Sequence, residues 1–288
     1  MDKHNFLVIG MGEVLWDLLP QGKKLGGAPA NQVFHAAQLG AKSLLISAIG
    51  QDELAEELVA ELDEKGVAHA LARVDKPTGT VAVRLREGIP DYEIREDVAW
   101  DHLRLTVEAR MALASASAFC FGSLAQRSET SRKAIAEALG LLPAEALRFC
   151  DLNLRQNFHD REALLFCLTQ ANILKINEEE LSHLAQELGL EGTLEQKLLT
   201  LSERFELKGL ALTRGGAGSL LLRGGQISEM PARSVRVADT IGAGDSFSAA
   251  LVVGWLSGLP LDELHERASA LSAFVCTQQG AMPEHPRP

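Results

Sequence analysis

Residues 239–254 read DTIGAGDSFSAALVVG, a Gly-rich turn with an aspartate at each end that runs directly into an apolar helical pattern. Phe247, Ala250 and Leu251 recur at helical spacing, which predicts a helix that begins near Ala243 or Gly244. The first N–H groups of a helix have no partner within it and carry the positive end of its dipole. Glycines allow the backbone to approach a ligand closely, so we expect an anion-binding cradle here.

Asp245 falls in the first turn of this predicted helix. A carboxylate in that place is often only a stabiliser of the helix N-terminus. It would repel an anion bound in the cradle, unless it has a chemical task such as accepting the proton of a hydroxyl that attacks a phosphoryl group. The segment alone leaves both interpretations open.

Polar or Gly-rich clusters follow predicted strands at five other places. They are Gly12–Asp17 (GEVLWD), Gly26–Asn31 (GGAPAN), Asp151–Arg155 (DLNLR), Asn177–Glu180 (NEEE) and Thr213–Gly218 (TRGGAG). The carboxyl ends of parallel strands form one edge of a sheet, which is where open α/β sheets bind ligands. We therefore expect all five clusters to line one edge, and this favours a chemical role for Asp245.

Short apolar runs alternate with amphipathic helical patterns along most of the chain. The runs cover residues 6–13, 43–50, 118–124, 147–154, 172–177 and 209–215. A hairpin is predicted after them at 219–230. Repeated strand–helix units predict an α/β fold with a mostly parallel sheet and helices on both faces. Segments of about 14–25 and 78–97 do not fit that sheet, because polar residues alternate through them. They predict a small β element with one wet face that covers the ligand edge.

The bulk composition excludes several classes of protein. The 288 residues include 28 Lys and Arg against 39 Asp and Glu, and the net charge of −11 argues against a general nucleic-acid surface. The sequence shows no apolar run of about 18 residues and no signal-peptide pattern, so we expect neither a membrane span nor secretion. Four scattered cysteines suit reduced thiols in a cytoplasmic protein. The eight histidines lack metal-binding spacing, so no zinc site is predicted.

Together, DTIGAGDSF and GGAPAN resemble motifs of the ribokinase-like (PfkB) carbohydrate kinases, and the similarity extends over essentially the whole chain. The resemblance implies a ribokinase-like three-layer α/β/α sandwich with a central mostly parallel sheet and a small β-strand lid. It implies a single carbohydrate kinase domain over 1–288, with the segments of about 14–25 and 78–97 as the lid.

The resemblance also implies a role for each motif residue. Asp245 matches the catalytic base, and the backbone N–H groups of Gly242, Ala243 and Gly244 match the hole that holds the transferred phosphoryl group. Residues matching the sugar-binding positions are Asp17, Gly27, Asn31 and Arg155. Those matching the ATP-binding positions are Asn177, Thr213, Gly215 and Gly218. Glu180 matches a position tied indirectly to Mg²⁺, and Asp239 matches an acid of a monovalent-cation (K⁺) site.

Among members of that family, GGAPAN together with GEVLWDLLP is most similar to fructokinases. A 2-keto-3-deoxygluconate kinase is the first alternative, and a ribokinase-type sugar kinase is the next, although their sugar-binding turns usually differ from GGAPAN. A non-catalytic sugar- or nucleotide-binding regulator is disfavoured by the intact Asp245 motif. A nicotinamide dehydrogenase is disfavoured because GMGEVL lacks the third glycine of a dinucleotide turn. A homodimer through the lid stays open, and for Val98–Leu103 we expect only that Trp100 packs at the base of the lid.

Overall fold

The computed structural model describes residues 5–19, 22–86 and 89–286, with the side chains of 83–92 left out. In this part of the chain a nine-stranded sheet has the order β13-β12-β11-β10-β9-β8-β1-β4-β5. Its strands are β1 (Leu7–Met11), β4 (Lys42–Ile49), β5 (His69–Arg73), β8 (Ala118–Gly122), β9 (Leu147–Asp151), β10 (Ile173–Asn177), β11 (Gly209–Thr213), β12 (Ser219–Arg223) and β13 (Gln226–Met230). Neighbouring strands run parallel from β5 across to β11, and β12 is antiparallel to both of its neighbours.

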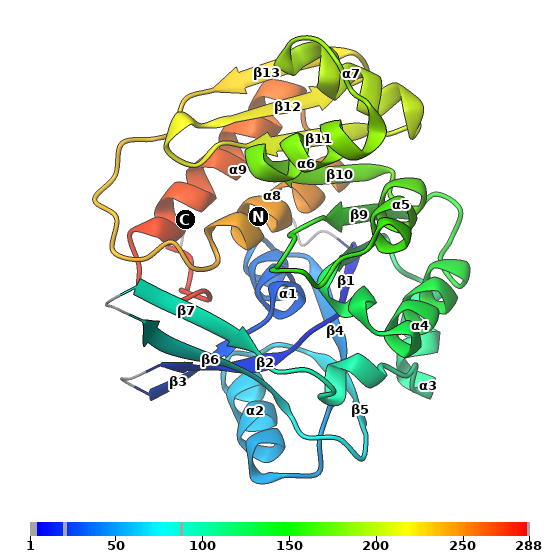
Figure 1. The fold of residues 1–288 in the computed structure, drawn as a ribbon, viewed down its shortest axis with the longest axis vertical. Helices are drawn as coiled ribbons and strands as arrows, with labels where there is room; N and C mark the ends of the chain where they lie inside the picture. Colours follow the sequence, from blue (N-terminus) through cyan, green and yellow to red (C-terminus); the bar gives the residue numbers. More distant parts are fainter. Residues whose placement is uncertain (1–4, 20–21, 87–88, 287–288) are drawn as a thin grey trace.

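Helices cover both faces of this large sheet (Figure 1). One face packs against α1 (Ala28–Gln38), α8 (Ala243–Leu256) and α9 (Leu261–Cys276). The other packs against α3 (Val107–Leu113), α4 (Glu129–Gly140), α5 (Arg161–Gln170), α6 (Glu178–Leu188) and α7 (Leu194–Arg204). Val8 and Ile9, successive residues of β1, lie in the two different cores, as the alternation of a strand requires. The predicted three-layer α/β/α sandwich is confirmed.

A small sheet stands apart from the large one, with the order β3-β2-β6-β7. It consists of β2 (Leu15–Leu19), β3 (Gly22–Gly26), β6 (Gly79–Arg86) and β7 (Ile89–Ile94). Figure 1 shows it beside α2 (Glu53–Glu64), and the Trp16 indole donates to the Leu54 carbonyl at 3.0 Å. These strands come from the two segments with alternating polar residues. The turn predicted between β6 and β7 falls at 87–88, outside the described residues.

The N-termini of the helices differ in a way that bears on function. Asp52 caps α2 by accepting from the Ala55 N–H at 2.9 Å, and α3, α5, α6 and α7 have a similar side-chain cap. By contrast, α8 follows Gly242 in the left-handed region and has no side-chain cap. The Ala243 N–H donates to the Thr240 carbonyl at 3.3 Å, and the other N–H groups of the first turn lie open to a ligand because no side chain caps them. None of the helices in the described residues combines the length and apolar character needed to cross a bilayer.

Two elements were not predicted. The edge strand β5 has the sequence HALAR, which carries little β-branching, and α3 is only seven residues long. Both depend on packing rather than on a strong local pattern, since Ala70 and Ala72 and the α3 residues Ala109 and Leu113 are buried in the core.

Candidate active site

The N-termini of α1 and α8 meet at the carboxyl edge of the large sheet, and their contact defines the candidate site. Asn31 of α1 donates its side-chain N–H to Asp245 Oδ2 of α8 at 2.7 Å, across 214 positions of sequence. Burial raises the pKa of Asp245 to about 6, and the nearby Asp151 adds to the rise, while the Asn31 hydrogen bond opposes it. A carboxylate with this pKa is ionised at neutral pH yet basic enough to take up a proton.

A buried ion pair between Lys175 and Asp151 lies near this contact and was not predicted from the sequence. Lys175 of β10 and Asp151 of β9 are register partners, and Lys175 Nζ lies 2.9 and 2.7 Å from the two Asp151 oxygens. Ser248 of α8 donates to Asp151 at 2.9 Å, and the Gln32 amide donates to it at 3.4 Å. Burial opposes the charge of Lys175, but the attraction of Asp151 outweighs it and raises the pKa of Lys175.

A signal for this pair was present in the sequence. Lys175 interrupts the apolar run NILKIN, and a lysine in a buried strand nearly always has a charged partner. The preceding strand ends in Asp151, and consecutive strands of an α/β sheet are usually neighbours. Reading the two strands together would have predicted the pair.

Of the two glycines in the predicted anion cradle, Gly242 has no room for a side chain, whereas Gly244 has ordinary contact distances. Gly242 has φ 78°, and a Cβ added to it would lie 2.6 Å from the Ala281 carbonyl oxygen. A Cβ at Gly244 would lie 3.4 Å from Lys175 Nζ. The N-terminus of α8, with Ala243 as its first residue, thus lies directly against the buried ammonium group. The positive end of the helix favours an anion here, while the charge of Lys175 is offset by its ion pair with Asp151.

The predicted sugar-binding residues lie around the same edge. Gly27 has φ 118° at the entrance to α1, and a Cβ there would lie 2.4 Å from the Glu13 carbonyl oxygen. The Glu13 carboxyl accepts from the Ala28 N–H at 3.3 Å, and burial raises its pKa to about 7. Glu13 lies within GEVLWD, but nothing in the sequence distinguishes it from any other acid after a strand.

Asp17 lies on β2 and faces the site from the small sheet. Burial raises its pKa to about 6, and the charges of Arg155 and Lys24 oppose the rise. A Cβ at Gly26 would lie 2.5 Å from Asp17 Oδ2, so this glycine makes room for the carboxylate. The exposed Arg155 also lowers the pKa of Glu13 and of Asp245. The charge of Arg155 thus acts on three carboxylates of the site.

The predicted nucleotide residues form a glycine-lined loop after β11. Thr213 ends the strand, and Gly215 has no atoms near enough to contact an added Cβ. Gly218 has φ 96°, and a Cβ there would lie 2.0 Å from the Met230 carbonyl oxygen. The Arg214 N–H closes the loop by donating to the Gly218 carbonyl at 2.8 Å. The result is a closed backbone turn with an open outer face.

Asn177 and Glu180 form the capping box of α6. Asn177 Oδ1 accepts from the Glu180 N–H, and Glu180 Oε2 accepts from the Asn177 N–H, both at 2.8 Å. Glu180 Oε1 also accepts from the Leu154 N–H at 2.8 Å, next to Arg155. Within the described residues no three His, Cys, Asp or Glu side chains gather closely enough to hold a metal ion. Both Glu180 oxygens already accept backbone N–H groups, and an indirect role of Glu180 toward Mg²⁺ stays a prediction of the sequence.

Asp239, the first acid of the motif, lies apart from Asp245 and connects two loops. Its oxygens accept from the Ile241 N–H at 3.0 Å and from the Gly280 N–H at 3.1 Å. The C-terminal segment is thus held beside Gly242, where Ala281 supports the cradle. A cation role for Asp239 stays a prediction.

One detail of the predicted edge differs from the structure. Four of the five clusters follow strands of the large sheet, namely β1, β9, β10 and β11, but GGAPAN follows β3 of the small sheet. The chain leaves the edge after β1, forms the β2–β3 hairpin and returns to the same edge to begin α1. GGAPAN therefore reaches the site, although not as the end of a large-sheet strand.

Comparison with known proteins agrees with this geometry. The model of the pfkB family of carbohydrate kinases matches residues 20–287. A sugar kinase of Pyrococcus horikoshii is 30% identical over 296 residues, covering 96% of this chain and 91% of the relative. Its crystal structure in complex with ATP superposes with a TM-score of 0.82 and 29% identity, covering 97% of this chain and 95% of that one.

Two further proteins are similar to this chain. A fructokinase of Salmonella typhimurium is 30% identical over 292 residues, covering 94% of each chain. A 2-dehydro-3-deoxygluconokinase of Thermotoga maritima superposes with a TM-score of 0.83, covering 99% of this chain and 97% of that one, but at 20% identity it shows the fold alone. The resemblance inferred from the motifs is confirmed: the chain belongs to the pfkB family of carbohydrate kinases and is a sugar kinase, a phosphotransferase with an alcohol group as acceptor.

Proposed function

We propose that this sugar kinase transfers the γ-phosphate of ATP to a primary hydroxyl of a monosaccharide, with fructose as the preferred acceptor. The observation that carries the proposal is the Asn31–Asp245 hydrogen bond. It places the turn expected to bind sugar directly against the carboxylate expected to act as base. Asn31 Oδ1 is buried and has no hydrogen-bond partner among the described residues, so it can accept from a sugar hydroxyl while the amide N–H holds Asp245.

Asp245 accepts the proton of the sugar hydroxyl as the oxygen attacks phosphorus. The N–H groups at Gly242, Ala243 and Gly244 stabilise the charge on the transferred group, and the nearby Lys175 stays paired with Asp151. Arg155, a planar cation beside the site, neutralises charge between sugar and phosphate. Positioning and charge neutralisation of this kind supply most of the catalysis in phosphoryl transfer.

The residues present fit ATP and Mg²⁺. The loop from Thr213 to Gly218 offers open backbone for phosphates, and Asn177 stands at the end of the neighbouring strand. Mg²⁺ commonly keeps several waters and binds through phosphates and only one or two carboxylates, so the lack of a three-acid cluster in the described residues does not conflict with it. When bound, Mg²⁺ would neutralise phosphate charge. Glu180 would act on the ion indirectly, without coordinating it.

Fructose is favoured because GGAPAN and GEVLWD resemble the fructokinase motifs, and fructokinases are among the relatives at about 30% identity. The alternatives are 2-keto-3-deoxygluconate and a ribokinase-type sugar. Asp17 and Asn31 together offer acceptors and a donor suited to vicinal hydroxyls. K⁺ binding near Asp239, a homodimer through the small sheet and a cytoplasmic location stay predictions of the sequence.

The proposal is tested by ADP release with ATP and Mg²⁺ against fructose, ribose, 2-keto-3-deoxygluconate, adenosine and tagatose. We expect the largest kcat/KM with fructose. A larger value for 2-keto-3-deoxygluconate or ribose would replace the substrate but keep the reaction. ADP release that no sugar in the panel stimulates would contradict this choice of acceptors.

A further inference from the structure

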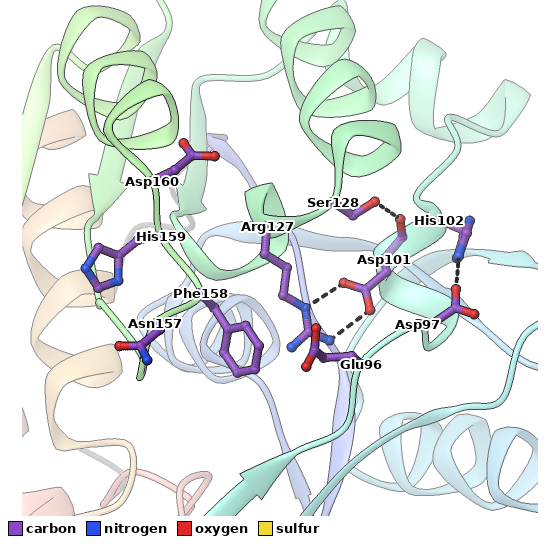
Figure 2. A pocket seen from close by; sticks show the side chains of 10 residues that line it. All are labelled: Glu96, Asp97, Asp101, His102, Arg127, Ser128, Asn157, Phe158, His159 and Asp160. Carbon is purple, nitrogen blue, oxygen red and sulfur yellow. Dashed lines mark hydrogen bonds and ion pairs between the residues drawn. The ribbon is translucent and has the colours of Figure 1, made fainter.

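The segment Val98–Leu103, to which the sequence assigned no chemistry, surrounds a buried arginine. Arg127 ends a short 3₁₀ helix (Leu124–Arg127) after β8, and its side chain is only 7% exposed. Its Nε and Nη2 donate to the two Asp101 oxygens, each at 2.8 Å. Figure 2 shows this side chain between Asp101 and Phe158, at the wall of a cavity of about 340 Å³.

The guanidinium group of Arg127 also holds the base of the small sheet. Nη2 donates to the Arg95 carbonyl at 2.7 Å, one residue after β7. The guanidinium carbon lies 3.9 Å from the centre of the Trp100 ring. Trp100 in turn packs on Gly79, the first residue of β6, where an added Cβ would lie 2.5 Å from the indole. One side chain thus fixes the end of β7 directly and the start of β6 through Trp100.

On its other side the same group contacts the loop that carries Arg155. The guanidinium carbon lies 4.6 Å from the centre of the Phe158 ring, and the Phe158 N–H donates to the Arg155 carbonyl at 3.1 Å. Asn153 and Gln156 in this loop have φ of 45° and 47°, a conformation that non-glycine residues adopt only when their surroundings hold them. The packing of Phe158 on Arg127 provides such a hold.

From these contacts we infer that Arg127 is a positioning residue that couples the small sheet to the Arg155 loop. Asp17 reaches the site from the small sheet and Arg155 reaches it from the loop. The separation of Asp17 and Arg155 is therefore set by Arg127, whose side chain contacts both the small sheet and the loop. This inference rests on the proposed function, because it assigns Arg127 the task of setting sugar geometry before transfer. Within the described residues Arg127 contacts neither Asn177 nor the Thr213–Gly218 loop. The Arg155 loop does reach Glu180 through the Leu154 N–H, so we expect an effect on ATP that is smaller than the effect on the sugar.

The test must separate positioning from folding, since removing one partner of a buried pair destabilises a protein. Arg127→Leu alone leaves Asp101 buried without its cation. Arg127→Leu/Asp101→Asn removes both charges, keeps an acceptor for the Val98 N–H and should regain most of the thermal stability. In the double variant we expect KM for the sugar to rise about tenfold or more, with KM for ATP within about twofold of wild type. Arg132→Leu is the matched control, because Arg132 contacts Gln126 and Asp160 but neither Arg95 nor Phe158.

Hydrogen exchange gives a second measurement that needs no substrate. The Arg95 and Phe158 amides, bonded to the Thr80 and Arg155 carbonyls, should exchange faster together in the double variant and stay protected in Arg132→Leu. Unchanged sugar KM, or unchanged exchange at both amides, would overturn the inference. If wild type itself showed no sugar-dependent ADP release, the proposed function would fail, and the exchange result would still decide whether Arg127 couples the two segments.

Discussion

Replacing Asn31 by leucine should change the pH dependence of the enzyme in a defined direction. The Asn31 amide is the strongest of the influences that lower the pKa of Asp245, which is about 6 with the bond in place. A hydrogen bond to a charged group contributes about 1.5–3 kcal/mol, and one pKa unit corresponds to about 1.4 kcal/mol. Loss of the bond should therefore raise the pKa of Asp245 by about one to two units.

The base must be ionised to accept a proton, so activity is present above this pKa and falls as pH drops through it. The acidic limb of kcat/KM for the sugar should have its midpoint near pH 6 in wild type and near about 7–8 in Asn31→Leu. Sugar-dependent ADP release measured from pH 5 to 9 gives both midpoints. The loss of a sugar contact lowers the whole curve without moving its midpoint, so the two effects separate.

Gln32→Leu is the control for this experiment, because Gln32 is the next residue of α1 and donates to Asp151 rather than to Asp245. Its midpoint should stay close to that of wild type. A midpoint in Asn31→Leu that matches the control would refute the assignment of Asp245 as the group titrating in the acidic limb, or the contact that sets its pKa.

Other outcomes follow from the same geometry. Lys175→Met leaves Asp151 buried without its cation and should lower the free energy of unfolding, measured in urea, by about 3–5 kcal/mol. The double variant Lys175→Met/Asp151→Leu should lose less stability, because it removes both charges. Equal losses in the two variants would contradict a paired charge. Gly242→Ala introduces a Cβ 2.6 Å from the Ala281 carbonyl oxygen and should reduce kcat, whereas Gly258→Ala, also at positive φ (69°) but with open space around it, should lose about 1–2 kcal/mol of stability and keep kcat. A Gly242→Ala enzyme with wild-type kcat would contradict the claim that catalysis needs the backbone of the cradle in its present position.

The layered fold was predictable because its strands and helices carry strong local patterns. Buried runs such as FLVIG and NILKIN, each followed by a helix, determine the architecture through the rules for parallel sheets. The short elements β5 and α3 lacked such patterns, and only their packing on the core reveals them.

For the site, the sequence placed Asp245 and Asn31 at one edge but could not bring them into contact. That contact depends on α1 and α8 packing side by side on the same face, which no local periodicity specifies. Trp100 packs at the base of the small sheet as expected, but its partnership with Arg127 joins three loops distant in sequence. Residues that act through others, such as Lys175 and Arg127, carry no motif and become visible only through their partners.

The central claim is that Asp245 is the base in phosphoryl transfer from ATP to a sugar. The most direct measurement compares fructose-dependent ADP release by wild type and Asp245→Asn, with thermal unfolding of both proteins to show that the fold is kept. Asparagine has nearly the same shape but does not accept the proton, so kcat should fall by about 10²–10⁴-fold. A folded Asp245→Asn enzyme that retains near wild-type, fructose-dependent ADP release would contradict the claim.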